Sequence, residues 1–346
     1  MRTLFALTAL APLCALIPLA TAPASAQTAM PQPASPILIA PPNAVPAVAL
    51  PCTRACMEEL ADRFLKALAA RNPQALPLAG TIRYTEMGQA LALGDGLWGT
   101  ASDVGNYRHV FADPQSGQIG LFATMKENGK PFVMGARLRV ELGRISEIEV
   151  VLYRSGTGPA WNDNGVLELD KSGKPKDFWT AAPPPGQRLS RQELVAAANS
   201  YFDSLQNNDG KKQYPFTDDC DRLENGVFTT NNPGTVRMGD VDIGGMGCRQ
   251  QFETGLYGVV TRIHHRRFPV VDEERQIVFA LGVFDHAGTI HELTMPSGKK
   301  VSTGMFSKPS SILISEAFKM QGKLIQKVEA VGASVPYHMH PGWGER

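Results

Sequence analysis

The same order of sequence patterns occurs twice along this chain, and that repetition restricts its fold more than any other feature. In each copy an amphipathic segment, first residues 57–68 and then residues 191–205, carries apolar side chains at helical spacing. Ser190 and Glu193 form a capping box at the start of the second segment. Each segment is followed by alternating segments that predict long antiparallel strands. We therefore predict an α+β protein with two related domains.

Short sequence matches connect the two copies. The matched pairs are residues 96–100 with 226–230, residues 113–122 with 272–279, and residues 137–149 with 318–329. From them we predict domains at residues 52–154 and 190–337 and a tail at residues 338–346. The Gly- and Pro-rich residues 155–189 form a linker, in which residues 166–169 could add an edge strand.

The N-terminus has the pattern of an export signal. Arg2 precedes an apolar run at residues 4–22, and Ala24-Ser25-Ala26 provides the small residues that signal peptidase recognises. Pro12 and Pro18 interrupt the run and disfavour the alternative, a membrane anchor. We predict a signal peptide at residues 1–26, followed by a Pro/Ala-rich, poorly ordered leader at residues 27–50. The protein would be exported, to the periplasm or outside the cell.

The charge balance restricts the partners of the exported chain. Cleavage would remove Arg2 and no acidic residue, which leaves 33 basic residues (34 minus 1), 33 acidic residues and a formal charge of zero. Without a basic tract the chain is a poor partner for nucleic acid. No later apolar stretch has membrane-spanning length. We expect neither nucleic acid nor, after cleavage, a membrane as a partner.

Four cysteines follow the predicted signal peptide. An even number in an oxidising compartment favours two disulfides, and the natural pairing is Cys52–Cys56 and Cys220–Cys248, each within one domain. A zinc site is the alternative, but C-x3-C with two distant cysteines does not match a zinc-ribbon spacing.

Several segments resemble the nuclear transport factor 2-like superfamily, which includes the SnoaL-like enzymes. The closing hairpins "GRISEIE" and "GKLIQKVE" are similar to the last hairpin of that fold. "DCDRLENG", "VDEERQIV" and "VEAVGASVPY" resemble secreted two-copy members from fungi and bacteria, mostly of unassigned function. The resemblance implies two cone-shaped domains, each with a long N-terminal helix packed on a curved antiparallel sheet. Such cones hold small hydrophobic or aromatic ligands, and a homodimer is a further assembly to consider.

Six of the seven histidines lie in the second half of the chain, which makes the second copy the better candidate for chemistry. The densest cluster spans residues 262–268, just after Tyr257. Strand alternation predicts that one face carries Arg262, His264, Arg266 and Phe268. There His264 could act as a base beside arginines that, with Tyr257, stabilise an oxyanion. The alternative is a solvated, salt-bridged outer strand.

Other candidates lie near turns and at the chain end. His286 is the second candidate base, and a hairpin could bring it near His291. His338 and Trp343 belong to an aromatic tail that could cover a pocket mouth or form a dimer contact. The pair His338-x-His340 is a weak metal signal because no third ligand has a recognisable spacing, so we predict no metal.

Arg222 and Glu224 lie close to Cys220 and are predicted at the mouth of the second pocket. A structural ion-pair network is the alternative. Tyr84 and Trp98 could line a pocket in the first domain, although core packing explains them as well.

The chain has no nucleophile elbow, phosphate-binding loop or dinucleotide motif, so we predict no cofactor. Two functions follow. The first is a cofactor-independent lyase (dehydration or deformylation type) or isomerase acting on a small hydrophobic, aromatic compound in the second cone; the resemblance adds lignin-derived compounds as one class. The second is a non-catalytic exported module that binds a ligand or a protein.

Overall fold

The computed structural model describes residues 52–155 and 164–344. The predicted signal peptide and leader lie outside the described residues, as do residues 345–346 of the predicted tail. The bounds, contacts and absences given below refer to the described ranges.

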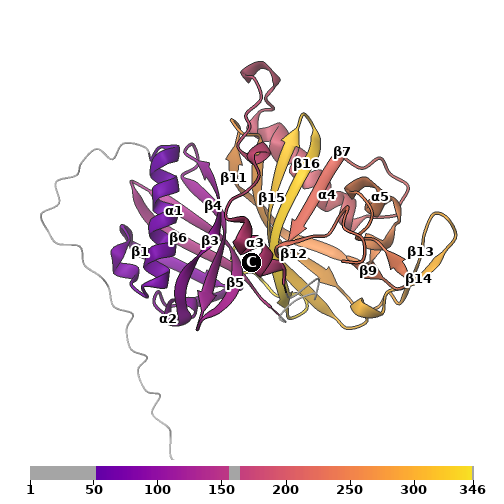
Figure 1. Ribbon diagram of the computed structural model, residues 1–346, viewed down its shortest axis with the longest axis horizontal. Coiled ribbons are helices and arrows are strands. Elements are labelled where there is room, and N and C mark those ends of the chain that lie inside the picture. The colour runs from indigo at the N-terminus through magenta and orange to yellow at the C-terminus, as the bar shows by residue number, and fades with distance from the viewer. Residues whose placement is uncertain (1–51, 156–163, 345–346) are drawn as a thin grey trace, which may run out of the picture. The chain divides into compact units, whose positions relative to one another are not determined.

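The first half contains a helix and a six-stranded sheet in the order β2-β1-β6-β5-β4-β3 (Figure 1). β1 and β6 are parallel, and the other neighbours are antiparallel. The elements are α1 (Arg54–Ala69), β1 (Leu78–Glu86), β2 (Gln89–Leu91), α2 (Leu97–Thr100), β3 (Ala101–Asp113), β4 (Gln118–Glu127), β5 (Lys130–Glu141) and β6 (Arg144–Arg154).

The second half repeats this arrangement. Its sheet has the order β8-β7-β16-β15-β12-β11, and β7 is parallel to β16. The elements are α4 (Arg191–Gln206), β7 (Phe216–Glu224), β8 (Val227–Phe228), β11 (Arg262–Asp272), β12 (Ile277–His286), β15 (Ser310–Gln321) and β16 (Leu324–Val335). Insertions add β9 (Arg237–Met238), β10 (Val241–Asp242), α5 (Cys248–Glu253), β13 (Glu292–Thr294) and β14 (Lys300–Ser302).

Strand order and hydrogen bonding correspond in the two sheets, so the predicted repetition of elements is present. One predicted match is wrong. The turn at Asn225-Gly226 corresponds to Met87-Gly88, and all four residues have positive φ. Residues 96–100 instead contain the short helix α2 and its N-cap, Gly96. Residues 96–100 and 226–230 have similar sequences. The structural correspondence of the two halves is instead set by the left-handed turn that follows β1 and β7.

Each sheet has its own apolar core on the face that its helix covers. α1 buries Leu60, Phe64 and Leu68 against β3 and β4, and α4 buries Leu194, Tyr201 and Phe202 against β11 and β12. The predicted capping box of Ser190 and Glu193 begins α4.

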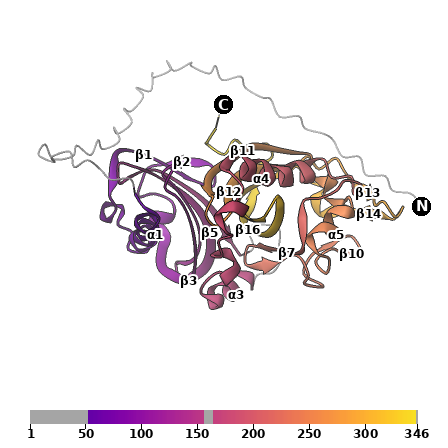
Figure 2. The same cartoon turned by 90° about the horizontal axis from the view of Figure 1, so that it is seen from above.

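A third apolar cluster lies between the other faces of the two sheets. Phe111, Phe122 and Val133 of the first half pack there with Phe279 and Leu313 of the second half. Figure 2 shows α1 on the side of the first sheet that faces away from the second sheet.

The segment predicted as a linker contributes to this third cluster. Residues 166–169 are not an edge strand, because they belong to the helix α3 (Gly165–Ser172). Val166 and Leu169, three residues apart, share one buried helix face, and Trp179 joins them in the cluster.

Both predicted disulfides are present. Cys52 is bonded to Cys56 and Cys220 to Cys248, with Cα–Cα distances of 5.4 and 5.7 Å. Among the described helices, none is long and apolar enough to cross a membrane.

Candidate functional site

A cavity of about 100 Å³ lies on the α4 side of the second sheet. About 10–15 Å³ on the same measure is enough for one water molecule, so the cavity has room for a small organic ligand. Its walls are mainly apolar, and among the residues that line it are Leu205, Met238, Ile243, Val260, Phe284 and Ile314.

Strand alternation directs a polar group into this apolar cavity. On β15, Ile312, Ile314 and Glu316 alternate toward the cavity, and on β12 Phe284 and His286 do so. The other polar lining residues are Arg222 and Glu224 of β7, Tyr201 of α4, and Tyr257, together with Thr229 and Arg237.

Arg222 is the centre of this group. Its guanidinium donates to the hydroxyl of Tyr201 at 3.2 Å and to the hydroxyl of Tyr257, and its Nε lies 3.4 Å from Glu224 Oε1. The Tyr257 hydroxyl donates in turn to Gln251 Oε1 at 2.7 Å. Burial raises the pKa of Tyr257 to about 12, so its hydroxyl stays protonated at neutral pH. A buried, permanently charged guanidinium is thus held in place by two phenols.

Glu316 contributes a second, uncharged carboxyl group. Burial raises the pKa of Glu316 well above its usual value, and the charge of Glu224 acts in the same direction. Arg222 and a hydrogen bond with Tyr201 oppose this shift without outweighing it. Burial therefore favours the carboxylic acid form of Glu316, which can donate a hydrogen bond.

His286 ends β12 at the cavity wall, and its ring stacks on Phe306 with centroids 4.5 Å apart. Burial lowers the pKa of His286 to about 4, although Asp285 and a hydrogen bond to the Phe284 backbone act in the opposite direction. Nδ1 of the ring is buried and has no hydrogen-bond partner. The neutral ring therefore lines the cavity with a polar atom that is free to bind a ligand.

Three buried polar atoms at the cavity lack hydrogen-bond partners: Glu316 Oε2, His286 Nδ1 and Arg222 Nε. An unsatisfied buried polar atom costs about 1–3 kcal/mol, and native structures contain few of them. Their gathering at one apolar cavity indicates a place for a ligand with polar groups.

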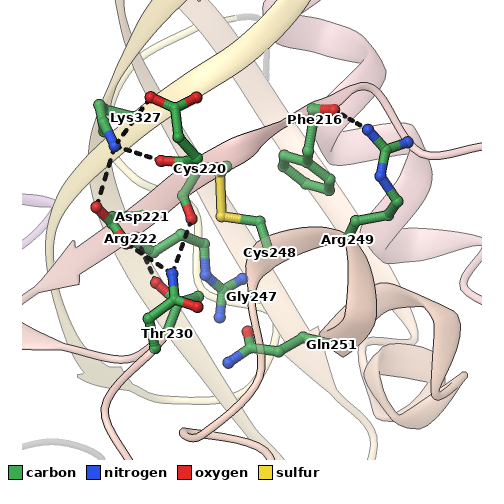
Figure 3. The surroundings of a disulfide bond; sticks show 12 residues. Phe216, Cys220, Asp221, Arg222, Thr230, Gly247, Cys248, Arg249, Gln251 and Lys327 are labelled. Carbon is green, nitrogen blue, oxygen red and sulfur yellow. Dashed lines mark hydrogen bonds and ion pairs between the residues drawn. A yellow bond between two sulfur atoms is a disulfide. The ribbon is translucent and has the colours of Figure 1, made fainter.

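The second disulfide supports β7, the strand that carries Arg222 and Glu224. Figure 3 shows the Cys220–Cys248 bond beside Arg222 and Gln251. Lys327 of β16 donates to Asp221 Oδ2 at 3.0 Å and to the Asp219 carbonyl on the same strand. The predicted network around Cys220 is therefore present, and Arg222 also lines the cavity.

The structure brings together four of the predicted site residues, Arg222, Glu224, Tyr257 and His286. It does not bring His264 to them. The predicted alternation of residues 262–268 is wrong because the pairing of β11 with β12 shifts between His264 and Arg267, and His265 has φ of +51°. This bulge leaves His264 on the opposite face of the sheet from Arg266 and Phe268.

The arginines and the phenylalanine of that segment have other contacts. Arg266 pairs with Asp203 of α4 at 2.5 Å. Phe268 packs against Phe202, and neither Arg266 nor Phe268 lines the cavity. Arg262 is exposed, with Nη1 3.3 Å from His338 Nε2.

His264 and His338 lie on either side of the buried carboxylate of Asp285. His264 Nε2 is 3.2 Å from Oδ1, and His338 Nδ1 is 2.9 Å from Oδ2. Burial lowers the pKa of His264, while the pKa of Asp285 is lowered by hydrogen bonds from Ser311 and His338, which outweigh its own burial.

The remaining predicted residues lie elsewhere. His291 is exposed and does not line the cavity. Trp343 is buried in the first half, where its Nε1 donates to Thr85 Oγ1 at 2.7 Å and the Arg83 guanidinium stacks on its ring. The predicted tail therefore contacts the first sheet and not the cavity mouth.

Tyr84 and Trp98 belong to the first core, as the packing alternative predicts. By strand register Tyr84 occupies the place of Arg222, and Glu86 that of Glu224. Glu86 Oε2 accepts from the Tyr84 hydroxyl at 3.0 Å and from Leu97 N at 2.6 Å. At this place in the sheet the first half thus has the carboxylate, with a tyrosine where the second half has the arginine.

Sequence reasoning missed Glu316, Tyr201 and Gln251. Glu316 had a readable signal, because it is one carboxylate at an inward position of the apolar strand Ile312–Phe318. Tyr201 and Gln251 had none, since each resembles an ordinary helix residue.

The comparison with protein families gave a match in the second half of the chain. Residues 187–332 match a protein family described as a domain of unknown function, DUF8021, which is less than half of the chain. No curated protein matches the chain.

Proposed function

We propose that the second half is a cofactor-free lyase or isomerase that moves a proton in a small, mainly apolar carbonyl or hydroxyl compound. The observation that carries the proposal is the presence of two unpartnered buried polar atoms, Glu316 Oε2 and His286 Nδ1, at an apolar cavity that Arg222 also lines. We also propose that the chain is exported and that both halves are nuclear transport factor 2-like cones. The two disulfides, the leader pattern and the repeated helix-on-sheet units support this wider proposal.

The residues have distinct roles in this proposal. His286, neutral and with its Nδ1 unpartnered, accepts the proton. The carboxylic acid of Glu316 and the guanidinium of Arg222 donate to the oxygen on which negative charge develops. Tyr201 and Tyr257 position Arg222, and Glu224 balances its charge. In an apolar cavity these donors act without competition from water.

The test is a thermal-shift screen of the full chain against small aromatic and aliphatic ketones and hydroxyketones, followed by mass spectrometry for loss of water, loss of formaldehyde or isomerisation. Glu316→Gln and His286→Gln should each lower turnover at least about 100-fold, as expected for loss of a general acid or base. Glu253→Gln and His291→Gln change exposed residues outside the cavity and serve as matched controls.

Two results contradict the proposal. A ligand that stabilises the wild-type chain without any product would indicate a binding module. A product formed equally well by both cavity variants would place the chemistry elsewhere.

A further inference from the structure

A second group of polar side chains lies on the opposite face of the same sheet. Asp285 precedes the cavity residue His286 on β12, so its side chain points away from the cavity. His264 approaches it from β11, and His338 approaches from the segment that follows β16. Three distant parts of the chain therefore meet at one carboxylate.

The donor atoms suit a metal ion. One atom from each of His264, Asp285 and His338 lies within 4.8 Å of the others. Zinc bonds of about 2.0–2.2 Å imply separations of about 3.3 Å between tetrahedral ligands. The two histidine–carboxylate distances, 3.2 and 2.9 Å, are already close to that value. His338 is half exposed and lies outside the sheet, so it can make the remaining adjustment.

The ligand candidates also have the outer partners that metal ligands usually have. Ser311 Oγ donates to Asp285 Oδ1 and accepts from the backbone N of His338 at 2.8 Å. His264 Nδ1 faces His265 Nδ1, and the His265 ring lies 4.4 Å from that of His340. Such contacts orient the carboxylate and the ring before a metal arrives.

We propose that His264, Asp285 and His338 bind one divalent transition-metal ion of the zinc type, which attaches the C-terminal segment to the second sheet. Two imidazoles and one carboxylate suit zinc, copper or nickel and do not suit calcium or magnesium, which prefer oxygen ligands. The exposed side of His338 leaves a position for water. When the ion binds His264 Nε2 and His338 Nδ1, the single proton of each neutral ring lies on the other ring nitrogen.

One neighbour opposes the ion. Arg262 Nη1 lies 3.3 Å from His338 Nε2 and adds positive charge. Because Arg262 is exposed, its guanidinium can turn toward water when the ion binds. This inference is independent of the proposed reaction, since the cavity lies on the other face of the sheet.

The test is zinc titration of the full, metal-stripped chain by calorimetry, with the bound metal measured by mass spectrometry. We expect one zinc ion per chain, and no binding of magnesium at the same concentration. Asp285→Asn and His338→Asn should abolish stoichiometric binding, and Ser311→Ala should weaken it about 10- to 100-fold. His291→Ala changes an exposed histidine outside the group and should bind as the wild-type chain does.

Limited proteolysis gives a second measurement. Zinc should protect the segment after Val335 from cleavage in the wild-type chain but not in His338→Asn, a variant that keeps a hydrogen-bond donor for Asp285. A wild-type chain without bound zinc, or an Asp285→Asn variant that binds zinc equally well, would overturn the proposal. The three side chains would then only attach the tail by hydrogen bonds.

Discussion

His286 and Glu316 face the same cavity, and burial changes their pKa values in opposite directions. Burial disfavours the charged form of each group, so the pKa of the imidazole falls and that of the carboxylic acid rises. His286, with a pKa of about 4, is therefore neutral at pH 7, and burial favours the neutral form of Glu316. The proposed proton acceptor and donor line different parts of one cavity, since His286 pairs with Ser310 and Glu316 with Ala280.

At the residue scale we predict that His286 weakens the protein in acid. Its pKa is about 4 in the folded chain and about 6.5 when unfolded, so the unfolded state binds more protons between these values. Stability from this residue is complete above pH 6.5 and falls by about 3 kcal/mol as the pH drops to 4. Urea unfolding should show that, between pH 7 and pH 4, the free energy of unfolding falls by about 3 kcal/mol less in His286→Gln than in the wild-type chain. An equal loss in both proteins would show that His286 is not buried as described.

At the scale of elements, the strand β7 carries both one cysteine of the second disulfide and two side chains of the candidate site. It carries Cys220, Arg222 and Glu224 within five residues, and the disulfide attaches it to the start of α5. α5 also supplies Gln251, which accepts from the Tyr257 hydroxyl. The bond between these elements therefore fixes the framework that holds the cavity arginine.

We predict that the two disulfides differ in their contribution to stability. The Cys220–Cys248 bond joins residues 28 apart and the Cys52–Cys56 bond residues 4 apart. In the chain-entropy relation these separations correspond to about 3.6 and 1.9 kcal/mol. Urea unfolding of Cys220→Ala/Cys248→Ala should show the larger loss, with Cys52→Ala/Cys56→Ala as the matched control. Equal losses would indicate that loop closure is not the main contribution.

At the scale of the whole described chain, the two sheets pack closely at Gly120 of the first sheet. A Cβ added to Gly120 of β4 would lie 2.6 Å from the ring of Phe279 on β12. Polar contacts also connect the halves: His109 Nδ1 lies 2.7 Å from Glu329, and Arg267 forms an ion pair with Glu149 of β6. Such buried contacts favour joint unfolding of the two halves.

We predict that Gly120→Ala lowers the free energy of unfolding by about 1–3 kcal/mol, the usual cost of overfilling a packed interior. Gly80→Ala is the control, because a Cβ there meets no atom within 4 Å. Chemical denaturation followed by tryptophan fluorescence and circular dichroism measures both variants. A Gly120→Ala variant as stable as the control would mean that the sheets do not meet at this position.

Local patterns in the sequence determined the order of helices and hairpins, both disulfide pairs and the capping box of α4. The helices, the hairpins and the capping box depend on residues close together in the chain. The disulfide pairs follow from an even number of cysteines, which allows few pairings. The same patterns selected Arg222, Glu224, Tyr257 and His286, which the structure brings to one cavity.

Only the tertiary structure decided which side chains share a site. The bulge at His265 separates His264 from the cavity, and alternation along the strand could not reveal it. The sheet register places Glu316 across β16 from Glu224, and the returning tail places His338 beside Asp285. These meetings depend on pairings between strands far apart in sequence, for which a single sequence contains no local signal.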